Sequence, residues 1–399
     1  MLSSRSSTKL IGRRKLFILV GLLVVGGLIV LEFGSTIAVK LHLVHIHIEK
    51  NVSLLNSSDS KKLDGVKVIY GATVIHTPTD VWKGWYDFRS CEYSNCVVQY
   101  SHDHEFIEKA DIVLFTFNKI TSYPILPHEV RQKQVWLVFS HESPGYEVNR
   151  GPSKVDGCFN GSMTYRTDSL VADTYGRISK RVEQPKPRDY SSGKTKAAYV
   201  YISNCRSVQY HRLNLVQQLK KYIDVDIYGK CTGLLPCPRA DWTCEKRVHT
   251  QYYFYLSFEN SLCKDYITEK FWARLQSDGI YLPVALGGLS VNEYWAQAPP
   301  DSFLHAYNFS SLESLANYMK YLMTNPEAYN RYHKWREQYT ILEDRQEVSC
   351  RLCELANNKP SLLAVDKMSQ WFNDEGSCGA PETTWPIEQS PATWYHYWI

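Results

Sequence analysis

Charged and polar side chains gather within one short stretch of the chain, where they could bind a phosphate group. The stretch holds Glu259, Asn260, Tyr266, Glu269 and Lys270. A lysine in the first turns of a helix suits a phosphate, because the helix N-terminus also favours an anion. We therefore predict a ligand-binding corner here.

The pattern around these residues predicts a strand, a helix and a second strand. Residues 253–258 form a run rich in aromatic side chains, which is typical of a strand. Asp265 is the expected N-cap of a helix whose apolar face carries Ile267 and Phe271. Residues 280–286 form the second apolar run. Such a βαβ unit belongs to a parallel sheet, and ligands bind these sheets beyond the carboxyl ends of the strands.

A second carboxylate, Glu142, follows another expected strand. Residues 134–139 read Gln-Val-Trp-Leu-Val-Phe, and Ser-His-Glu-Ser-Pro comes directly after them. Pro144 fixes the backbone and prevents a helix from starting at Glu142. A carboxylate just past a strand end lies where α/β folds place their chemistry. The alternative is a solvated loop glutamate without a role.

A further βαβ unit follows from residue 197. Residues 197–203 and 224–228 are the expected strands, and Arg212 lies early in the helix between them. Neither GxGxxG nor GxxxxGK[ST] is present, so helix ends and basic side chains must meet any phosphate charge. Arg212 is placed for this, although an arginine exposed on the helix surface is the alternative.

Length and charge bound the remaining possibilities. With 399 residues, of which 44% are hydrophobic, the chain can fill the cores of two domains. The net charge is +4, but five basic residues lie before residue 16, so the remainder carries −1. This balance argues against nucleic acid as a partner.

An apolar run near the N-terminus predicts a membrane anchor. Residues 16–31 are all apolar or glycine, and the chain stays mostly apolar to residue 39. Basic residues precede the run, which favours a cytosolic N-terminus. A cleaved signal peptide is the alternative, but the basic region is long and no clear cleavage site follows at once. We expect a signal anchor, with the bulk of the chain in the secretory lumen.

Cysteines and sequons agree with a lumenal location. All 11 cysteines follow the apolar run, and their odd number leaves at least one thiol free or paired between chains. Cys350 and Cys353 have CxxC spacing, without the second pair that a metal site would need. They are therefore candidates for structural disulfides. The expected N-glycosylation sites are Asn51, Asn56, Asn160 and Asn308.

Several of these segments resemble one enzyme family. Phe-Glu-Asn-Ser, a short gap and Asp-Tyr-Ile-Thr-Glu-Lys resemble the signature of the α1,3-fucosyltransferases, family 10 of the glycosyltransferases, and the chain is identified as an invertebrate-like member. The Glu-Ser-Pro tripeptide resembles the segment that holds the catalytic base of this family. Residues 159–169 resemble another family stretch, in which Arg166 and Asp168 are expected to pair. The family also has a C-terminal CxxC in disulfides.

The resemblance covers roughly residues 66–355 and is strongest between 197 and 288. Residues 170–173 depart from the family pattern, so they are candidates for setting acceptor choice. The implied fold is α/β with GT-B architecture, in which two Rossmann-like domains face each other across a cleft. The expected parts are a cytosolic tail (1–15), a transmembrane signal anchor (16–39), a stem (40–64), an acceptor-binding domain (65–180), a linker (181–196), a GDP-fucose-binding domain (197–355) and a C-terminal tail (356–399).

The implied reaction transfers L-fucose from GDP-β-L-fucose to the 3-hydroxyl of GlcNAc with inversion. Glu142 would be the base, because a single displacement needs one base on the acceptor side. The expected donor-binding residues are Arg212 and Lys270 at the diphosphate, Glu269 near the developing charge on fucose, and Glu259, Asn260 and Tyr266 at the sugar or nucleotide. No DxD-like motif stands at a strand end, so the sequence requires no metal cofactor, and stimulation by a divalent cation stays open.

Alternatives remain for the acceptor and for activity. The chain could fucosylate the innermost GlcNAc of an N-glycan core instead of antennary LacNAc or LacdiNAc, and Glu-Ser-Pro favours the antennary group. It could also be an inactive lectin-like homologue, against which the intact charged residues argue. The expected partners are GDP-fucose, a GlcNAc-containing glycan and the membrane, and a homodimer stays open. The expected location is the Golgi membrane, with single-pass type II topology.

Overall fold

The structure is a computed structural model, and it describes a little over three fifths of the chain. The described ranges are 65–71, 87–100, 104–117, 133–144, 156–205, 212–237, 242–277, 281–342, 345–359, 365, 367–373 and 378–379. The expected cytosolic tail, signal anchor and stem lie outside these ranges, as do Asn51 and Asn56. No helix within the described ranges has the length and apolar character that crossing a bilayer requires.

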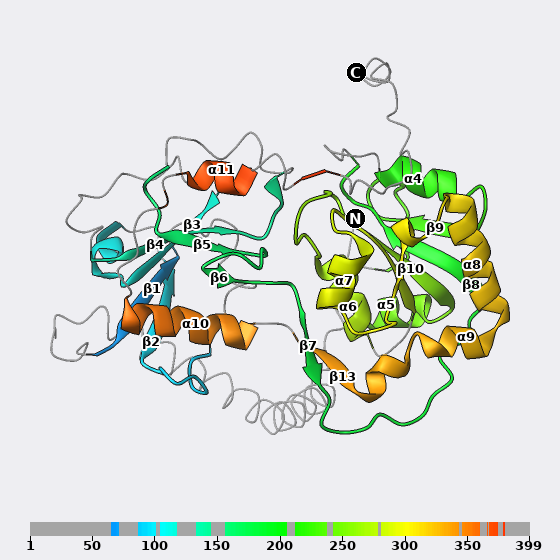
Figure 1. Ribbon diagram of the computed structural model, residues 1–399, viewed down its shortest axis with the longest axis horizontal. Helices are drawn as coiled ribbons and strands as arrows, with labels where there is room; N and C mark the ends of the chain where they lie inside the picture. Colours follow the sequence, from blue (N-terminus) through cyan, green and yellow to red (C-terminus); the bar gives the residue numbers. More distant parts are fainter. Residues whose placement is uncertain are drawn as a thin grey trace, which may run out of the picture. The chain divides into compact units, whose positions relative to one another are not determined.

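A six-stranded parallel sheet is built from the first part of the chain (Figure 1). Its strand order is β2-β1-β3-β4-β5-β6, and every pairing is parallel. The order reverses between β1 and β3, as in doubly wound folds. Its strands are β1 (Lys67–Gly71), β2 (Cys96–Tyr100), β3 (Ile112–Thr116), β4 (Val135–Ser140), β5 (Gly161–Thr164) and β6 (Val171–Ala172).

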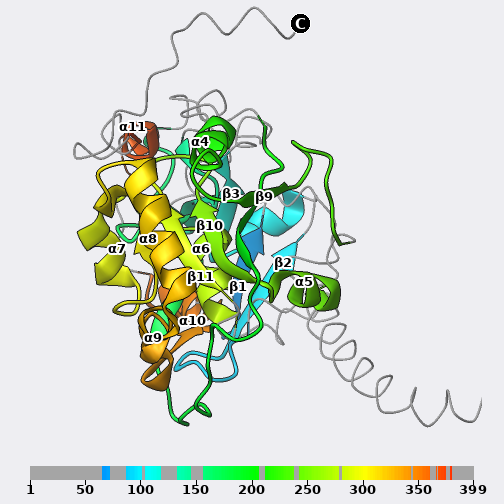
Figure 2. The ribbon, with the colours of Figure 1, turned by 90° about the vertical axis from the view of Figure 1, so that its right-hand side faces the viewer.

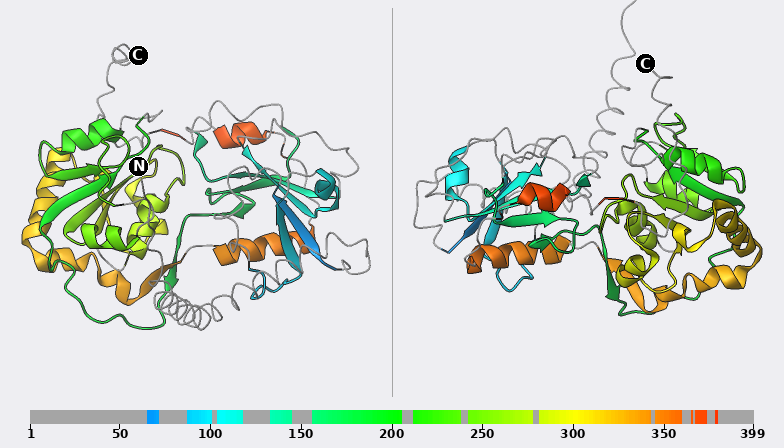
Figure 3. Two further views of the ribbon diagram at one scale, coloured as in Figure 1. Left: turned by 180° about the vertical axis from the view of Figure 1, so that it is seen from behind. Right: turned by 45° about the horizontal axis from the view of Figure 1, so that its top comes forward.

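Both faces of this sheet are covered, as the continuous apolar character of β3 and β4 requires. Alternate residues point to opposite faces, so Ile69 and Leu114 pack with Leu352 of helix α10, Arg345–Asn358. Phe115 packs on the other face with Phe372 of helix α11, Met368–Asn373. Figure 3 shows these two helices on opposite sides of the sheet. The predicted boundary at residue 355 did not anticipate this return of the chain to its first sheet.

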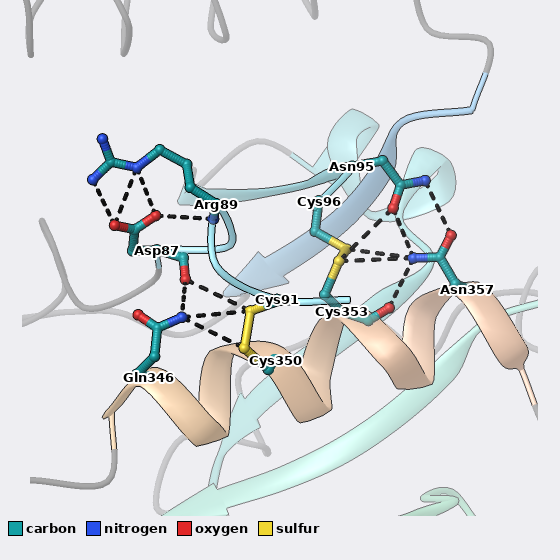
Figure 4. The surroundings of a disulfide bond; sticks show 9 residues. All are labelled: Asp87, Arg89, Cys91, Asn95, Cys96, Gln346, Cys350, Cys353 and Asn357. Carbon is teal, nitrogen blue, oxygen red and sulfur yellow. Dashed lines mark hydrogen bonds and ion pairs between the residues drawn. A yellow bond between two sulfur atoms is a disulfide. The ribbon is translucent and has the colours of Figure 1, made fainter. Parts of the chain in front are cut away.

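Two disulfides fix α10 to this sheet (Figure 4). Cys91 pairs with Cys350, and Cys96 at the start of β2 pairs with Cys353. The prediction that the CxxC cysteines form disulfides is therefore confirmed, and each bonds to a distant segment. The other pairs are Cys205–Cys231, Cys237–Cys244 and Cys263–Cys378, which leaves Cys158 as the free thiol.

A second parallel sheet follows, with the order β12-β11-β10-β8-β9. The order reverses between β8 and β10, which makes the gap between their carboxyl ends the switch point where ligands bind in such folds. The strands are β8 (Lys196–Tyr201), β9 (Val225–Tyr228), β10 (Tyr252–Phe258), β11 (Leu282–Leu286) and β12 (Leu304–His305). The strand, helix and strand predicted between residues 253 and 286 are present as β10, α6 (Glu269–Gln276) and β11.

Helices cover the second sheet on both faces (Figure 2). Leu215 of α4 and Met319 of α8 pack with Leu256 on one face. On the other face, Phe271 of α6 packs with Ala285 of β11. The helices are α4 (Arg212–Leu219), α5 (Trp242–His249), α6 (Glu269–Gln276), α7 (Val291–Gln297), η5 (Ala306–Asn308), α8 (Leu312–Thr324) and α9 (Pro326–Arg331).

A short antiparallel ribbon forms a third, separate sheet. Strand β7, Arg177–Lys180, pairs with β13, Tyr339–Leu342. β7 precedes the predicted linker 181–196, and β13 precedes α10. The chain passes between the two sheet-forming segments twice, once after β7 and once after β13. The ribbon pairs these two strands.

Candidate active site

The charged corner lies at the switch point of the second sheet. Glu259 comes directly after β10, and Arg212 opens α4, the helix that follows β8. β8 and β10 are neighbours in the sheet, so the chain brings these two residues to the same edge. α6, which carries Glu269 and Lys270, begins at this edge as well.

Glu259 holds the N-terminus of α6. Its carboxylate is fully buried and accepts hydrogen bonds from the backbone N–H of Thr268 at 2.8 Å and from the Thr268 hydroxyl at 2.7 Å. Thr268 is the N-cap of the helix, with its hydroxyl facing the N–H of Lys270. In the described structure, a carboxyl group of the protein therefore occupies this helix end. The pKa of Glu259 is raised, mainly by burial and in spite of Lys270.

The prediction that Asp265 caps the helix was wrong. Asp265 adopts a positive φ of 57°, and its carboxylate accepts hydrogen bonds from the N–H and hydroxyl of Thr167 at 3.0 and 2.6 Å. This bond to a distant segment competes with capping. Ile267 is buried but precedes the helix, which begins at Glu269. The signal for the true N-cap was present, because Thr268 stands directly before Glu-Lys-Phe.

Lys270 lies between two carboxylates. Its Nζ is 3.0 Å from Oε1 of Glu269 and 3.5 Å from Oε2 of Glu259, and it donates to the Thr268 hydroxyl at 2.9 Å. Burial lowers the pKa of Lys270, but the two carboxylates outweigh it, and the pKa is raised. Burial likewise opposes ionisation of Glu269, yet Lys270 holds its pKa below the ordinary value. The pairing of Lys270 with Glu269 therefore favours the charged form of both side chains.

Arg212 supplies a second buried cation. It is 3% exposed, and one terminal nitrogen donates to the carbonyl oxygen of Phe258 at 3.0 Å. Its Nε has no hydrogen-bond partner among the described residues. A buried donor without a partner is costly unless a ligand or water satisfies it. Arg212 also acts on Lys270, whose pKa its charge lowers, so the two cations lie near one another.

Glu142, the predicted base, is brought to this corner from the first sheet. It follows β4 by two residues, and its Oε2 accepts a hydrogen bond from the Tyr266 hydroxyl at 3.2 Å. Burial raises the pKa of Glu142, while Lys270 and Tyr266 act in the opposite direction. Tyr266 is 2% exposed, so its hydroxyl is directed at Glu142 within a buried environment. Asn260 is half-buried beside Glu259.

A histidine–aspartate pair adjoins Glu142. His141 Nε2 is 2.6 Å from a carboxylate oxygen of Asp173, and the Tyr175 hydroxyl donates to the backbone oxygen of His141 at 2.7 Å. Burial lowers the pKa of His141, but Asp173 outweighs it and raises the pKa overall. Asp173 belongs to the segment 170–173 that departs from the family pattern. No sequence pattern predicts its pairing with His141, because the two residues lie 32 positions apart in the chain.

Further contacts join the segments around Glu142 and Asp265. The Ser143 hydroxyl donates to that of Ser261 at 2.7 Å, and Lys264 lies 3.3 Å from Asp168. The expected pairing of Arg166 with Asp168 is confirmed at 2.7 Å.

The two sequons within the described ranges differ in their surroundings. Asn160 is half-buried beside β5, and its side-chain oxygen accepts a hydrogen bond from the backbone N–H of Trp136 at 2.9 Å. Asn308 is exposed at the end of η5. For metals, the described residues contain no group of three or more His, Cys, Asp or Glu side chains arranged to hold an ion.

Comparison with known proteins places these residues in a family. Residues 68–176 match the family model described as "Fucosyltransferase, N-terminal", and residues 191–371 match "Glycosyltransferase family 10 (fucosyltransferase) C-term". Alpha-(1,3)-fucosyltransferase C of Drosophila melanogaster is 32% identical over 309 residues, which cover 71% of this chain and 70% of that protein. Alpha-(1,3)-fucosyltransferase 7 of Bos taurus is 35% identical over 66% of this chain and 74% of its own length.

Other relatives are matched over less of their length or more distantly. Glycoprotein 3-alpha-L-fucosyltransferase A of Drosophila melanogaster is 33% identical, over 72% of this chain and just over half, 56%, of that protein. A crystal structure of an α1,3-fucosyltransferase is 14% identical with a TM-score of 0.49, covering 77% of this chain and 93% of that one. The family assignment therefore depends on the sequence matches. From these matches, the chain belongs to glycosyltransferase family 10, the fucosyltransferases.

Proposed function

We propose that this protein transfers L-fucose from GDP-β-L-fucose to the 3-hydroxyl of a GlcNAc residue, with inversion at the fucose anomeric carbon. The observation that carries the proposal is the 3.2 Å hydrogen bond between Tyr266 and Glu142. It joins the predicted base to the loop that leads into Glu269 and Lys270. Membership of a fucosyltransferase family supports the transferred sugar and the reaction class.

The base has the surroundings that its role needs. Deprotonated Glu142 would accept the proton of the acceptor hydroxyl as the oxygen attacks the anomeric carbon. Burial raises its pKa toward the range in which a carboxylate is an effective base at neutral pH. His141 is the less suitable base, since its Nε2 is engaged by Asp173.

Arg212 and Lys270 would stabilise the departing GDP. Negative charge grows on the diphosphate as the glycosidic bond breaks, and nearby cations lower that barrier. The buried Nε of Arg212, without a described partner, is a donor available to a phosphate oxygen. Lys270 would share its ammonium between the phosphate and its two carboxylates. Glu269, whose pKa is lowered, would remain ionised and face the positive charge that develops on fucose.

We further propose GT-B architecture, in which the first sheet's segment binds the acceptor and the second binds GDP-fucose. The doubly wound order of both sheets supports this. The alternatives are transfer to the innermost GlcNAc of an N-glycan core and an inactive lectin-like role. The charged groups assembled around Arg212 argue against the inactive form, because buried charges without ligands destabilise a fold.

The proposed location is the Golgi membrane, with one N-terminal anchor and the catalytic part in the lumen. The apolar run of residues 16–31 behind a basic segment supports the anchor. Five disulfides support an oxidising compartment.

Substitution Glu142→Gln tests the proposed reaction. It keeps the shape of the side chain and removes the base, so we expect fucose transfer to fall roughly 10²–10⁴-fold. GDP-fucose binding, measured by calorimetry, should change little, because the nucleotide contacts belong to Arg212 and Lys270. Glu313→Gln, an exposed glutamate at the start of α8, is the matched control.

Retention of more than about a tenth of wild-type turnover would show that Glu142 is not the base. An acceptor array with the wild-type protein would decide between antennary and core GlcNAc. Absence of GDP-fucose binding and turnover in the wild type would favour the lectin-like role.

A further inference from the structure

A second concave site lies between α7, β12 and α8, and no residue of the candidate active site lines it. Its volume is about 310 Å³, which is at the lower end of the range for ligand pockets. The residues that line it are Val291, Trp295, Asp301, Phe303, Leu304, His305, Asn308, Phe309, Tyr318 and Tyr332.

The walls of this pocket combine flat apolar faces with polar edges. Trp295 is 50% exposed, which is unusual for so large an apolar side chain. The rings of Phe309 and Tyr318 lie 5.5 Å apart, and the Tyr318 and Tyr332 hydroxyls are 2.9 Å apart. Asp301 adds an exposed carboxylate. A pyranose has an apolar C–H face and hydroxyls at its edges, so this mixture of groups suits a sugar ring.

Asn308 places the attachment point of a sugar within the lining of the pocket. It is exposed and belongs to the sequon Asn308-Phe309-Ser310. No described residue forms a hydrogen bond with its carboxamide, whereas the carboxamide of Asn160 is bound to the backbone of Trp136. The amide nitrogen of Asn308 can therefore carry a glycan without breaking a contact of the fold.

We propose that this pocket holds the first GlcNAc of an N-glycan attached to Asn308, with one sugar face on Trp295. The covalent link removes the need for high affinity, because a tethered ligand has a high effective concentration at its site. The proposal depends on a lumenal location and not on the transfer reaction. An experiment that refutes the glycan proposal therefore leaves the proposed fucose transfer standing, and the reverse also holds.

Protection of the Asn308–GlcNAc bond is the test. The full chain is produced in a secretory host, and peptide N-glycanase, which cleaves this bond, is applied under native conditions. Mass spectrometry follows the conversion of Asn308 to aspartate. We expect Trp295→Ala to accelerate release at Asn308 up to about tenfold, and Trp295→Phe to restore slow release. After denaturation all variants should be cleaved at one rate.

Tyr321→Ala is the matched control, since Tyr321 lies on α8 with 46% exposure and does not line the pocket. If Trp295→Ala is not secreted, Tyr318→Phe removes only a hydroxyl and should accelerate release to a smaller extent. An Asn308 without glycan, or release rates that are the same in wild type and both pocket variants, would overturn the proposal. The pocket variants should transfer fucose at the wild-type rate, whichever release rates are measured.

Discussion

The hydrogen bond from Tyr266 to Glu142 is one of the contacts that determine the pH at which the proposed base loses its proton. Tyr266 is among the groups that hold down the pKa of Glu142, against the larger effect of burial. In Tyr266→Phe the carboxylate loses this donor, so its pKa should rise further. A base acts only when deprotonated, and the acidic limb of kcat/KM against pH should therefore move to higher pH. At a pH near that limb, turnover should fall.

Tyr165→Phe is the control for this measurement. Tyr165 is also buried and its ring is 4.9 Å from that of Tyr266, but its hydroxyl has no partner among the described residues. Its removal should leave the acidic limb in place. A limb that stays fixed in Tyr266→Phe would mean that the observed ionisation belongs to another group.

The sequence was sufficient to predict which residues form the charged corner, but not which residues they contact. Glu142, Arg212 and Lys270 could be selected because each stands just beyond an expected strand or at an expected helix start. Their partners could not, because Tyr266 and Glu142 are 124 residues apart and meet only in the folded chain. The same applies to the pair formed by His141 and Asp173. Asp265 could either cap the nearby helix or bond to a distant segment. The sequence pattern favoured the cap, whereas the structure shows the bond to Thr167.

Helix α6 positions its charges through its first turn, and Lys270 tests that arrangement. Lys270→Ala should weaken binding of GDP alone by roughly 1.5–3 kcal/mol, the value of a charge-assisted contact. It should also lower stability, since Glu259 and Glu269 lose their shared cation. Calorimetry with GDP measures the first effect and thermal unfolding the second.

Lys264→Ala is the comparison, because Lys264 is a cation on the same loop that pairs with Asp168 instead. It should leave GDP affinity unchanged. Lys270→Ala with normal GDP affinity but reduced stability would assign this lysine to the two carboxylates alone.

The sequence pattern predicts strands of the two sheets, but it predicts only some of the helices that cover them. Apolar runs separated by a helical pattern identify β10, α6 and β11 from local information. The position of α10 depends on contacts with β1 and on disulfide bonds to Cys91 and Cys96, which lie more than 250 residues earlier in the chain. No local pattern contains that information, which is why residues up to 355 were expected in the GDP-fucose-binding domain.

At the scale of the whole molecule, the two bridges to α10 duplicate each other. Each closes a loop of nearly the same size, with sequence separations of 259 and 257. Removing one pair by cysteine-to-serine substitution should therefore cost little, because the other still closes the loop. Removing both should lower the free energy of unfolding by about 2–5 kcal/mol.

Thermal unfolding of the two single-pair variants and of the double variant measures this effect. The pair Cys237–Cys244, which spans only 7 residues, serves as a control for loss of a short loop. Additive losses would show that the bridges act independently, through local packing.

The spacing of these bridges also imposes a waiting time during synthesis. Ribosomes add about 5–20 residues per second, so Cys96 emerges roughly 10–50 s before Cys353. Cys158 and Cys205 emerge within that interval and offer earlier, incorrect partners. The first sheet also lacks α10 over one face until about nine tenths of the chain has been made. Production of the protein should accordingly depend on a disulfide isomerase, and shortened chains that end before residue 350 should be retained as mispaired species.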